Sequence, residues 1–478
     1  MNHRHWNRVL LAGVMFLCLL TGGCGDSAPW RYNPGIPAKP AALAAMTGNG
    51  QVSLSWTESP GAAGYTVYYG ASPGVTIATA ARVLEINSAS TSTIVTGLTN
   101  DVTYYFAITA DSINGKSPLS DQVAIAPSPP GAFKQSDLLG AWRFNVLVSG
   151  AGAGWMRGTA AIDGAGNISI LTFLDNSGNS SAPTGLFTAM TILPDGTVFQ
   201  AGTATGFHGE LSANQFKDTL VGTATTAASR QIMILQKQVD GIVFSSSDIK
   251  GTGKQGAGPL TFVYHQLSSG TNQEWEYAGG QVGQDQAVTY SSISAPTSRQ
   301  LPGTGSKVAS LAITPDGIVT ETANGVLPQP AAVMSHGVMS ADKMTVVGAM
   351  TDASGTFVLR VMQMIHPPSI ALTSSDYALT SLAGSYSLHT LTSGTAPLWA
   401  YGTLGVDTTG SVSFSSYLNS NAGLTLPAAF MLAMDQQGTL TKAVDTSYNG
   451  RLSYFGDMIV STRTDAAGGS ALDIALKR

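Results

Sequence analysis

Internal repetition is the feature that most restricts how this chain can fold. Residues 158–169 and 402–413 share a Gly-Thr pair, an apolar residue followed by Asp, and a Gly-x-apolar-Ser ending, all at identical spacing. A Pro-Asp-Gly turn at 194–196 returns at 315–317, and a fainter copy follows at 437–440. The copies lie roughly 110 to 130 residues apart, which is the size of a domain rather than of one solenoid turn. We therefore expect three tandem copies of one small domain.

Short apolar runs between turn residues indicate that each copy consists of antiparallel strands. The first copy contains about eight such runs, separated by Gly, Asp, Asn and Pro. The chain has 55 glycines and only 11% charged residues, which favours turns and strands over helices. We expect an all-β protein with copies at 137–240, 248–366 and 379–478, each closing into a meander barrel. The alternative is a single six-bladed β-propeller with two blades in each copy.

The opening of the first copy carries a further signal. It reads Leu139-Gly140-Ala141-Trp142, and the third copy opens with a similar phrase at 382–386. The Gly-x-Trp part resembles the opening of lipocalin and avidin-like barrels. This resemblance implies cup-shaped barrels whose interiors could hold a ligand.

A different pattern precedes the copies. Apolar and polar residues alternate over 52–56, which places Trp56 on the inner face of a strand, and Tyr104 stands where a tyrosine could pin a crossover between sheets. With these features, residues 37–127 resemble a fibronectin type III domain. The Pro-rich stretch that follows, at 128–136, predicts a stiff linker to the barrels.

The N-terminus has the pattern of an exported protein. Arg4 and Arg8 precede an apolar stretch at 9–20, which is too short to span a bilayer as a helix. The Leu-Thr-Gly-Gly-Cys sequence that ends at Cys24 resembles a bacterial lipobox. This resemblance implies a signal peptide at 1–23 and covalent lipid, palmitate included, on Cys24 of a bacterial lipoprotein.

Lipid on Cys24 would make the membrane a partner of the chain. Asp26 does not follow the cysteine directly, and the resemblance then implies the outer membrane. Residues 24–36, rich in Pro and Gly, predict a tether. Because Cys18 would leave with the signal peptide, the exported part would contain no free thiol and no disulfide.

Charge and motif content argue against several functions. A formal charge of −5 without a basic cluster excludes nucleic acid as an expected partner. We expect no cofactor and no metal, since His208 and His336 suit turns better than a metal site. Glu274 and Glu276 flank Trp275, but alternating Glu on a strand is more typical of a solvated face than of a glycosidase pair. We therefore predict that the protein is not an enzyme.

The function that we expect is binding, adhesion or scaffolding at the cell envelope. A passive structural spacer and an envelope carbohydrate-active hydrolase are the two alternatives. The expected partners are a glycan or an envelope or extracellular protein, besides the membrane. The candidate ligand contacts are the aromatic side chains Trp142, Trp155, Trp275 and Trp399.

Overall fold

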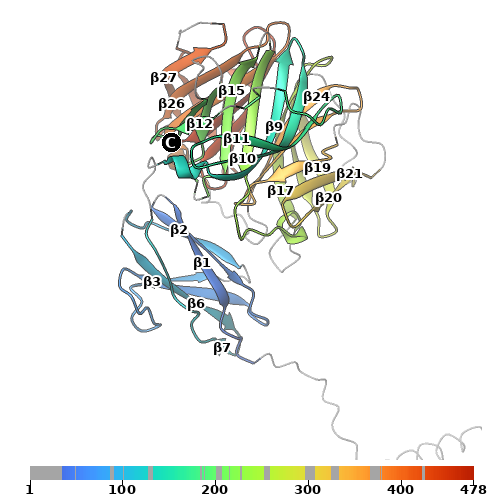
Figure 1. The fold of residues 1–478 in the computed structure, drawn as a ribbon. Coiled ribbons are helices and arrows are strands. Elements are labelled where there is room, and N and C mark those ends of the chain that lie inside the picture. Colours follow the sequence, from blue (N-terminus) through green and yellow to red (C-terminus); the bar gives the residue numbers. More distant parts are fainter. Residues whose placement is uncertain are drawn as a thin grey trace, which may run out of the picture.

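The chain folds into a two-sheet sandwich followed by three eight-stranded bodies (Figure 1). The computed structural model describes residues 35–478 except 49, 87–90, 101, 128–132, 184–185, 188, 201–206, 215, 227–228, 252–258, 297–306, 325–332, 367–376, 378 and 422–425. The predicted signal peptide, Cys24, most of the tether and part of the linker lie outside these residues. In the described part of the chain, no helix has the length and hydropathy to cross a bilayer.

The sandwich packs two sheets around one core, as the alternation predicted. One sheet contains β1 (Ala41–Gly48), β2 (Gln51–Thr57) and β5 (Ser92–Thr96). The other contains β3 (Gly64–Gly70), β4 (Arg82–Ile86), β6 (Tyr104–Ser112), β7 (Gly115–Lys116) and β8 (Val123–Ile125). Trp56 is buried between them and meets the ring of Tyr65 edge-on at 5.1 Å. The hydroxyl of Tyr104 accepts a hydrogen bond from the backbone of Thr99 (3.2 Å), which places this tyrosine at the predicted crossover.

Twenty-four further strands form three sheets of eight consecutive strands each. The first comprises β9 (Gly140–Gly150), β10 (Gly154–Ile162), β11 (Ile168–Asp175), β12 (Met190–Ile192), β13 (Thr197–Gln200), β14 (Phe207–Leu211), β15 (Thr219–Thr226) and β16 (Ser229–Lys237). The second comprises β17 (Leu260–Ser269), β18 (Trp275–Val282), β19 (Ala287–Ser294), β20 (Ala309–Ile313), β21 (Ile318–Ala323), β22 (Gly337–Met339), β23 (Thr345–Thr351) and β24 (Phe357–Met364). The third comprises β25 (Gly384–Ser393), β26 (Trp399–Val406), β27 (Ser411–Asn419), β28 (Phe430–Met434), β29 (Thr439–Lys442), β30 (Asp445–Leu452), β31 (Met458–Thr464) and β32 (Ser470–Lys477).

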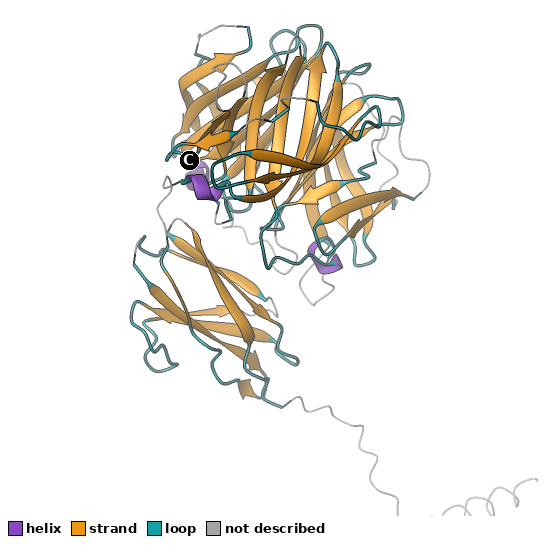
Figure 2. Ribbon diagram, viewed as in Figure 1, coloured by secondary structure: helices purple, strands orange, loops and turns teal. Residues whose placement is uncertain are grey.

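We refer to these sheets and their interiors as the first, second and third barrels. The second and third are closed, while the first has β11 and β12 at its edges and joins its first strand β9 to its last strand β16. The all-β prediction is thus confirmed. The six-bladed propeller is wrong, because each sheet continues through eight strands instead of breaking into four-stranded blades. Within the described residues, the helices are short (Figure 2).

Each barrel is closed at one end, its base, by a segment that precedes the first strand. An aromatic ring from this segment lies against the glycine of a tight turn, as Phe133 does at Gly196 and Tyr377 does at Gly438. These glycines have positive φ, so a side chain there would be strained as well as crowded. The short helices η1 (Gln135–Asp137), η2 (Ser246–Asp248) and α2 (Leu379–Leu382) lie in the same segments. We call the opposite end of each barrel its mouth.

Hydrogen bonds between the barrels follow a cyclic order. In each barrel, a tryptophan of the second strand donates its indole N–H to a threonine of the seventh strand of another barrel. The pairs are Trp155 with Thr351 (2.8 Å), Trp275 with Thr464 (3.0 Å) and Trp399 with Thr225 (2.6 Å). Because the third pair returns to the first barrel, the three barrels form a closed ring.

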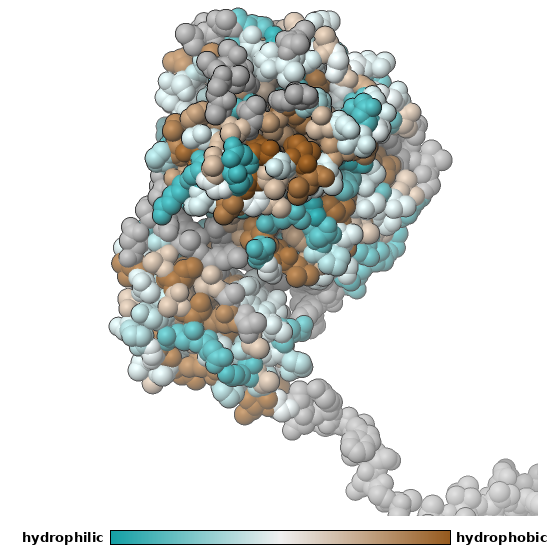
Figure 3. Space-filling model, viewed as in Figure 1, coloured by the Kyte–Doolittle hydropathy of each residue, from teal (hydrophilic) through white to brown (hydrophobic). Residues whose placement is uncertain are grey.

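A hydrophobic cluster fills the centre of this ring. It includes Leu147, Leu267 and Leu391 from the three first strands, and each of these leucines is fully buried. The outward faces of these first strands are buried as well, although they also carry polar residues such as Asn145, His265 and His389. The outer surface differs, since hydrophilic and hydrophobic residues are mixed over the face shown in Figure 3, as is usual for a surface in water.

Candidate functional sites in the barrel interiors

The strand register identifies equivalent inward-facing positions in the three barrels. On the first strand, the residue before each central leucine faces inward, and these residues are Val146, Gln266 and Thr390. The eighth strand places Met233, Arg360 and Asp473 beside them in the same order. The ring contacts thus repeat from barrel to barrel, whereas the interiors do not.

The interior of the first barrel is apolar and filled. Phe144, Val146 and Met233 are almost completely buried there. Phe187, from the segment between β11 and β12, packs its ring edge-on against Phe144 with 5.2 Å between the ring centres. This barrel therefore has a hydrophobic core rather than an open interior.

The interior of the second barrel is charged but closed. The Arg360 guanidinium lies 3.0 Å from the Glu321 carboxylate and donates two further hydrogen bonds to Gln266 (3.0 and 2.9 Å). Tyr264 donates a hydrogen bond to Glu276, and burial together with that carboxylate raises the pKa of Tyr264 well above its ordinary value. A buried ion pair with this many partners is well satisfied, so it serves as a polar core.

The two glutamates around Trp275 differ in their burial. Glu276 faces the interior of the second barrel and is 5% exposed. Glu274 lies just before β18, where its backbone exchanges hydrogen bonds with Ser268. Glu276 is thus buried, whereas Glu274 is partly exposed.

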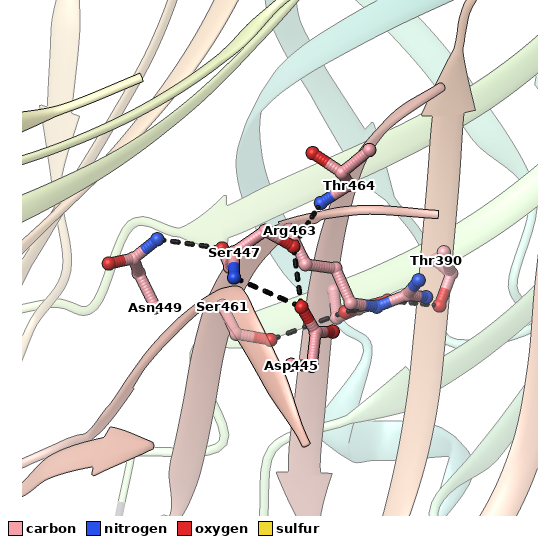
Figure 4. A network of polar contacts seen from close by, with 8 residues as sticks. Thr390, Asp445, Ser447, Asn449, Ser461, Arg463 and Thr464 are labelled. Atoms are coloured by element: carbon pink, nitrogen blue, oxygen red, sulfur yellow. Dashed lines mark hydrogen bonds and ion pairs between the residues drawn. The ribbon is translucent and has the colours of Figure 1, made fainter. Parts of the chain in front are cut away.

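The third barrel also contains a polar cluster, centred on Asp473. Its carboxylate accepts hydrogen bonds from the Arg463 guanidinium (2.8 and 3.2 Å), from Thr390 (2.6 Å) and from Ser461 (3.3 Å). Figure 4 shows Thr390 of β25 near Ser461 and Arg463 of β31, and β32, which carries Asp473, lies between these two strands in the sheet. The nearby negative charge of Asp473 is the main cause of the raised pKa of Arg463, so the guanidinium stays protonated.

Aromatic side chains surround this cluster and remain partly exposed. Phe414, Tyr417, Phe430 and Tyr448 face the interior, and each is only partly buried. Leu388, between the fully buried Tyr386 and the Asp473 partner Thr390 on β25, is also only partly buried. Burial raises the pKa of Tyr448 to about 12, so its hydroxyl is protonated at neutral pH. Leu388 of the third barrel is thus partly exposed, whereas Phe144 and Tyr264 at the equivalent positions of the first and second barrels are buried. Tyr290 and Ile293 of β19 are partly exposed in the second barrel, as Phe414 and Tyr417 are in the third.

The third barrel has a short turn at its mouth. In the third barrel, β29 and β30 are joined directly across the Lys442 and Asp445 pair, so the turn between them is two residues long. The corresponding strands of the second barrel, β21 and β22, are separated by residues 324–336.

The four tryptophans predicted from the sequence lie elsewhere. Trp142 is buried near the base of the first barrel, where its indole N–H donates to the Leu138 carbonyl (2.7 Å). The other three form the ring contacts described above. Ligand binding by these tryptophans stays a prediction, and the contacts that they make are structural.

His208 also lies between two barrels. The His208 ring stacks on Tyr401 of the third barrel with 5.5 Å between the ring centres, and burial lowers the pKa of His208. Among the described residues, no group of three or more His, Cys, Asp or Glu side chains is arranged to hold a metal ion.

Comparison with known proteins adds a family for one part of the chain. Residues 38–126 match the fibronectin type III domain. A curated relative, an amylopullulanase of Thermoanaerobacterium saccharolyticum, is 34% identical over 95 residues, which is 20% of this chain and 7% of that protein. The chain thus spans a small fraction of this relative's length.

Two solved structures illustrate how far structural similarity extends. One is titled a myokine structure and covers 20% of this chain and 98% of its own, at 22% identity and a TM-score of 0.16. The other is isotype 1 transferrin binding protein B from serogroup B Neisseria meningitidis, which covers 93% of this chain and 78% of its own at 8% identity and a TM-score of 0.22. TM-scores this low do not establish a shared fold.

The last hairpin of the fibronectin type III domain is held by a small charged network. The Lys116 ammonium lies 2.7 Å from the Asp111 carboxylate, which also accepts a hydrogen bond from Thr109 (2.8 Å). Ile113, at the tip of this hairpin, is 94% exposed. These polar contacts fix the hairpin, and they do not enclose a site.

Proposed function

We propose that the chain is an exported, membrane-anchored binding protein whose ligand enters the mouth of the third barrel. The observation that carries this proposal is the partial exposure of inward-facing aromatic side chains around Asp473 and Arg463. At the position of Asp473, the first barrel has the buried Met233 and the second has Arg360 in a closed ion-pair network. An accessible interior with few polar groups among aromatic ones is typical of a small-molecule site.

The residue types favour a saccharide. Aromatic rings such as Tyr417 and Phe430 offer flat apolar faces, on which the C–H face of a sugar ring can pack. Tyrosine hydroxyls and the guanidinium of Arg463 can exchange hydrogen bonds with sugar hydroxyl groups. We propose binding without catalysis, because four hydrogen bonds hold Asp473 in place and a glycosidase needs two carboxylates that flank the scissile bond.

A ligand panel tests the binding site. Full-length protein carrying Cys24→Ser would be screened against envelope saccharides, and the affinity for each ligand found would be measured by calorimetry. Tyr417→Ala should weaken binding about tenfold, or about 1.4 kcal/mol, since an aromatic face is lost.

The matched control is Tyr105→Ala, which removes a partly buried tyrosine from the fibronectin type III domain. It should leave the affinity unchanged. Failure of the whole panel to bind, or equal losses in the two variants, would count against the third barrel as the site.

We also propose that lipid on Cys24 holds the protein at the outer membrane, with the fibronectin type III domain as a spacer. The supporting observation is the lipobox-like sequence that ends at Cys24. Cells fed labelled palmitate should mark the wild-type protein, and Cys24→Ser should abolish the label and release the protein from the membrane fraction. An unmarked wild-type product would refute lipidation while leaving the binding proposal intact.

A further inference from the structure

One strand of the third barrel has a long edge without a partner strand. β27 pairs with β26 over most of its length, but it pairs with β28 only through Ser411 and Val412 at its start. Beyond Val412, β27 continues to Asn419. Among the described residues, no strand and no other backbone group bonds to the outer edge of β27 between residues 413 and 418. The backbone N–H and C=O groups of this edge therefore have no partner within the described chain.

This edge lacks the features that hinder pairing with another chain. Natural edge strands often carry charged side chains or proline, which prevent the addition of a further strand. β27 and β28 contain neither a charged residue nor a proline. Figure 1 shows β27 at the margin of the barrels. The free edge is thus suited to the addition of a strand.

Partly exposed aromatic rings lie beside the free edge. Phe414 of β27 and Phe430 of β28 have 6.3 Å between their ring centres, and the ring of Tyr417 meets Phe414 edge-on at 5.9 Å. All three side chains are only partly buried. A strand added to β27 would therefore find apolar ring surface on which its inward side chains can pack.

The first barrel shows what kind of side chain can fill the corresponding position. Its third strand, β11, has no pairing with β12. Leu186 and Phe187, from the segment between these strands, pack against the hydrophobic core of that barrel. In the corresponding segment of the third barrel, Leu426 is 48% exposed. The first barrel thus places apolar side chains of its own chain at this gap, whereas Leu426 stays at the surface of the third.

We propose that the free edge of β27 binds an extended peptide segment of another protein. The segment adds as a strand beside residues 413–418 and packs alternate apolar side chains on Phe414 and Phe430. An extended backbone presents donors and acceptors at the spacing of a strand edge, which a saccharide or a lipid does not. This inference goes beyond the proposed function, because the peptide binds at the side of the barrel and the saccharide enters at its mouth.

A peptide selection tests the inference. A phage-displayed library of random linear peptides would be selected on the full chain carrying Cys24→Ser, and the selected peptides would be titrated by calorimetry. They should alternate apolar and polar residues. Methylation of every second backbone nitrogen should abolish binding in one phase of the alternation and spare it in the other, because a strand bonds to one neighbour through every second residue.

Hydrogen exchange locates the bound peptide. The peptide should slow amide exchange in residues 413–418 and leave β11 and β19 unchanged, although β11 also has a free edge and β19 pairs with β20 over only a short stretch. Phe414→Ala should weaken peptide binding about tenfold, because an apolar contact surface is lost. Phe199→Ala, which removes a partly exposed ring from the first barrel, is the matched control and should leave the affinity unchanged.

Several results would overturn the inference. These are a selection that yields no binding peptide, binding that tolerates methylation in both phases, and slowed exchange confined to β11 or β19. Slowed exchange of residues 413–418 on concentrating the protein alone would also overturn it, since a second copy of the chain would then occupy the edge. If Phe414→Ala fails to fold, as its circular dichroism melt would show, the methylated peptides and the exchange data decide.

Discussion

Three aspartates, one from each barrel, lie close together at the bases of the ring. The Asp218 carboxylate accepts hydrogen bonds from the Ala341 backbone (2.7 Å) in the second barrel and from Asn214 (2.8 Å). Asn214 also bonds to Asp457 of the third barrel. Burial, and then the charges of Asp218 and Asp457, raise the pKa of Asp342 to about 8. These carboxylates are thus poorly suited to being ionised together.

This crowding predicts a pH-dependent stability. Asp342 has a higher pKa in the folded protein than its ordinary 3.8, so its contribution to stability is present at low pH and is lost as pH rises from 3.8 to about 8. Asp342→Asn should therefore raise the melting temperature at pH 8, by roughly 2 to 4 °C for each kcal/mol gained, and have little effect at pH 4.

Circular dichroism melts across this pH range measure the effect, and Asp240→Asn, at an exposed position, is the control. A melting temperature at pH 8 that is unchanged or lower in Asp342→Asn would contradict the proposed repulsion.

At the scale of strands, the alternation of apolar and polar residues correctly predicted which face of a strand is buried wherever the other face is exposed to solvent. Val52, Leu54 and Trp56 are buried together, as the pattern of that strand indicated. In the barrels the first strands are buried on their inner and outer faces alike, and their outward positions mix apolar residues such as Leu147 with polar ones such as Asn145 and His265. The sequence therefore could not show that Trp155, Trp275 and Trp399 point out of their barrels.

The site residues of the third barrel were missed for a related reason. Asp473 lies between Leu472 and Ile474 in a mostly apolar strand, and this isolated acidic residue was the signal in the sequence. Its partner Arg463 is distant from Thr390 in sequence, and only the closed sheet brings them together. The repeated copies and the strand-rich character could be predicted from the sequence. The polar cluster could not, because it depends on how distant strands pair in the closed sheet.

The ring contact predicts a measurable coupling between elements. Trp275→Phe keeps a large apolar ring but loses the hydrogen bond to Thr464, so the free energy of unfolding should fall by about 1 kcal/mol. In a double-mutant cycle with Thr464→Val, measured by urea denaturation, the two losses should not add. Additive losses would mean that the bond does not couple β18 to β31.

At the scale of the molecule, the apolar centre of the ring joins the barrels into one unit. Leu147, Leu267 and Leu391 would all be exposed if the barrels separated. Burial of apolar surface of this kind contributes about 25 cal/mol for each Å² removed from water.

Calorimetric unfolding should therefore give one transition for the three barrels and a separate one for the fibronectin type III domain. Leu267→Ala at the centre should lower the barrel transition and leave the other in place, since a buried leucine costs about 2 to 5 kcal/mol to remove. Independent melting of each barrel would contradict a single unit.

The cyclic hydrogen bonds between tryptophan and threonine have a consequence for how such a protein can evolve. Each barrel is held by its outer surface, and substitutions inside it do not touch its neighbours. One repeat can therefore acquire a new lining while the other two preserve the assembly. Duplication of this kind lets the binding specificity of one barrel change while the contacts that hold the ring together are kept.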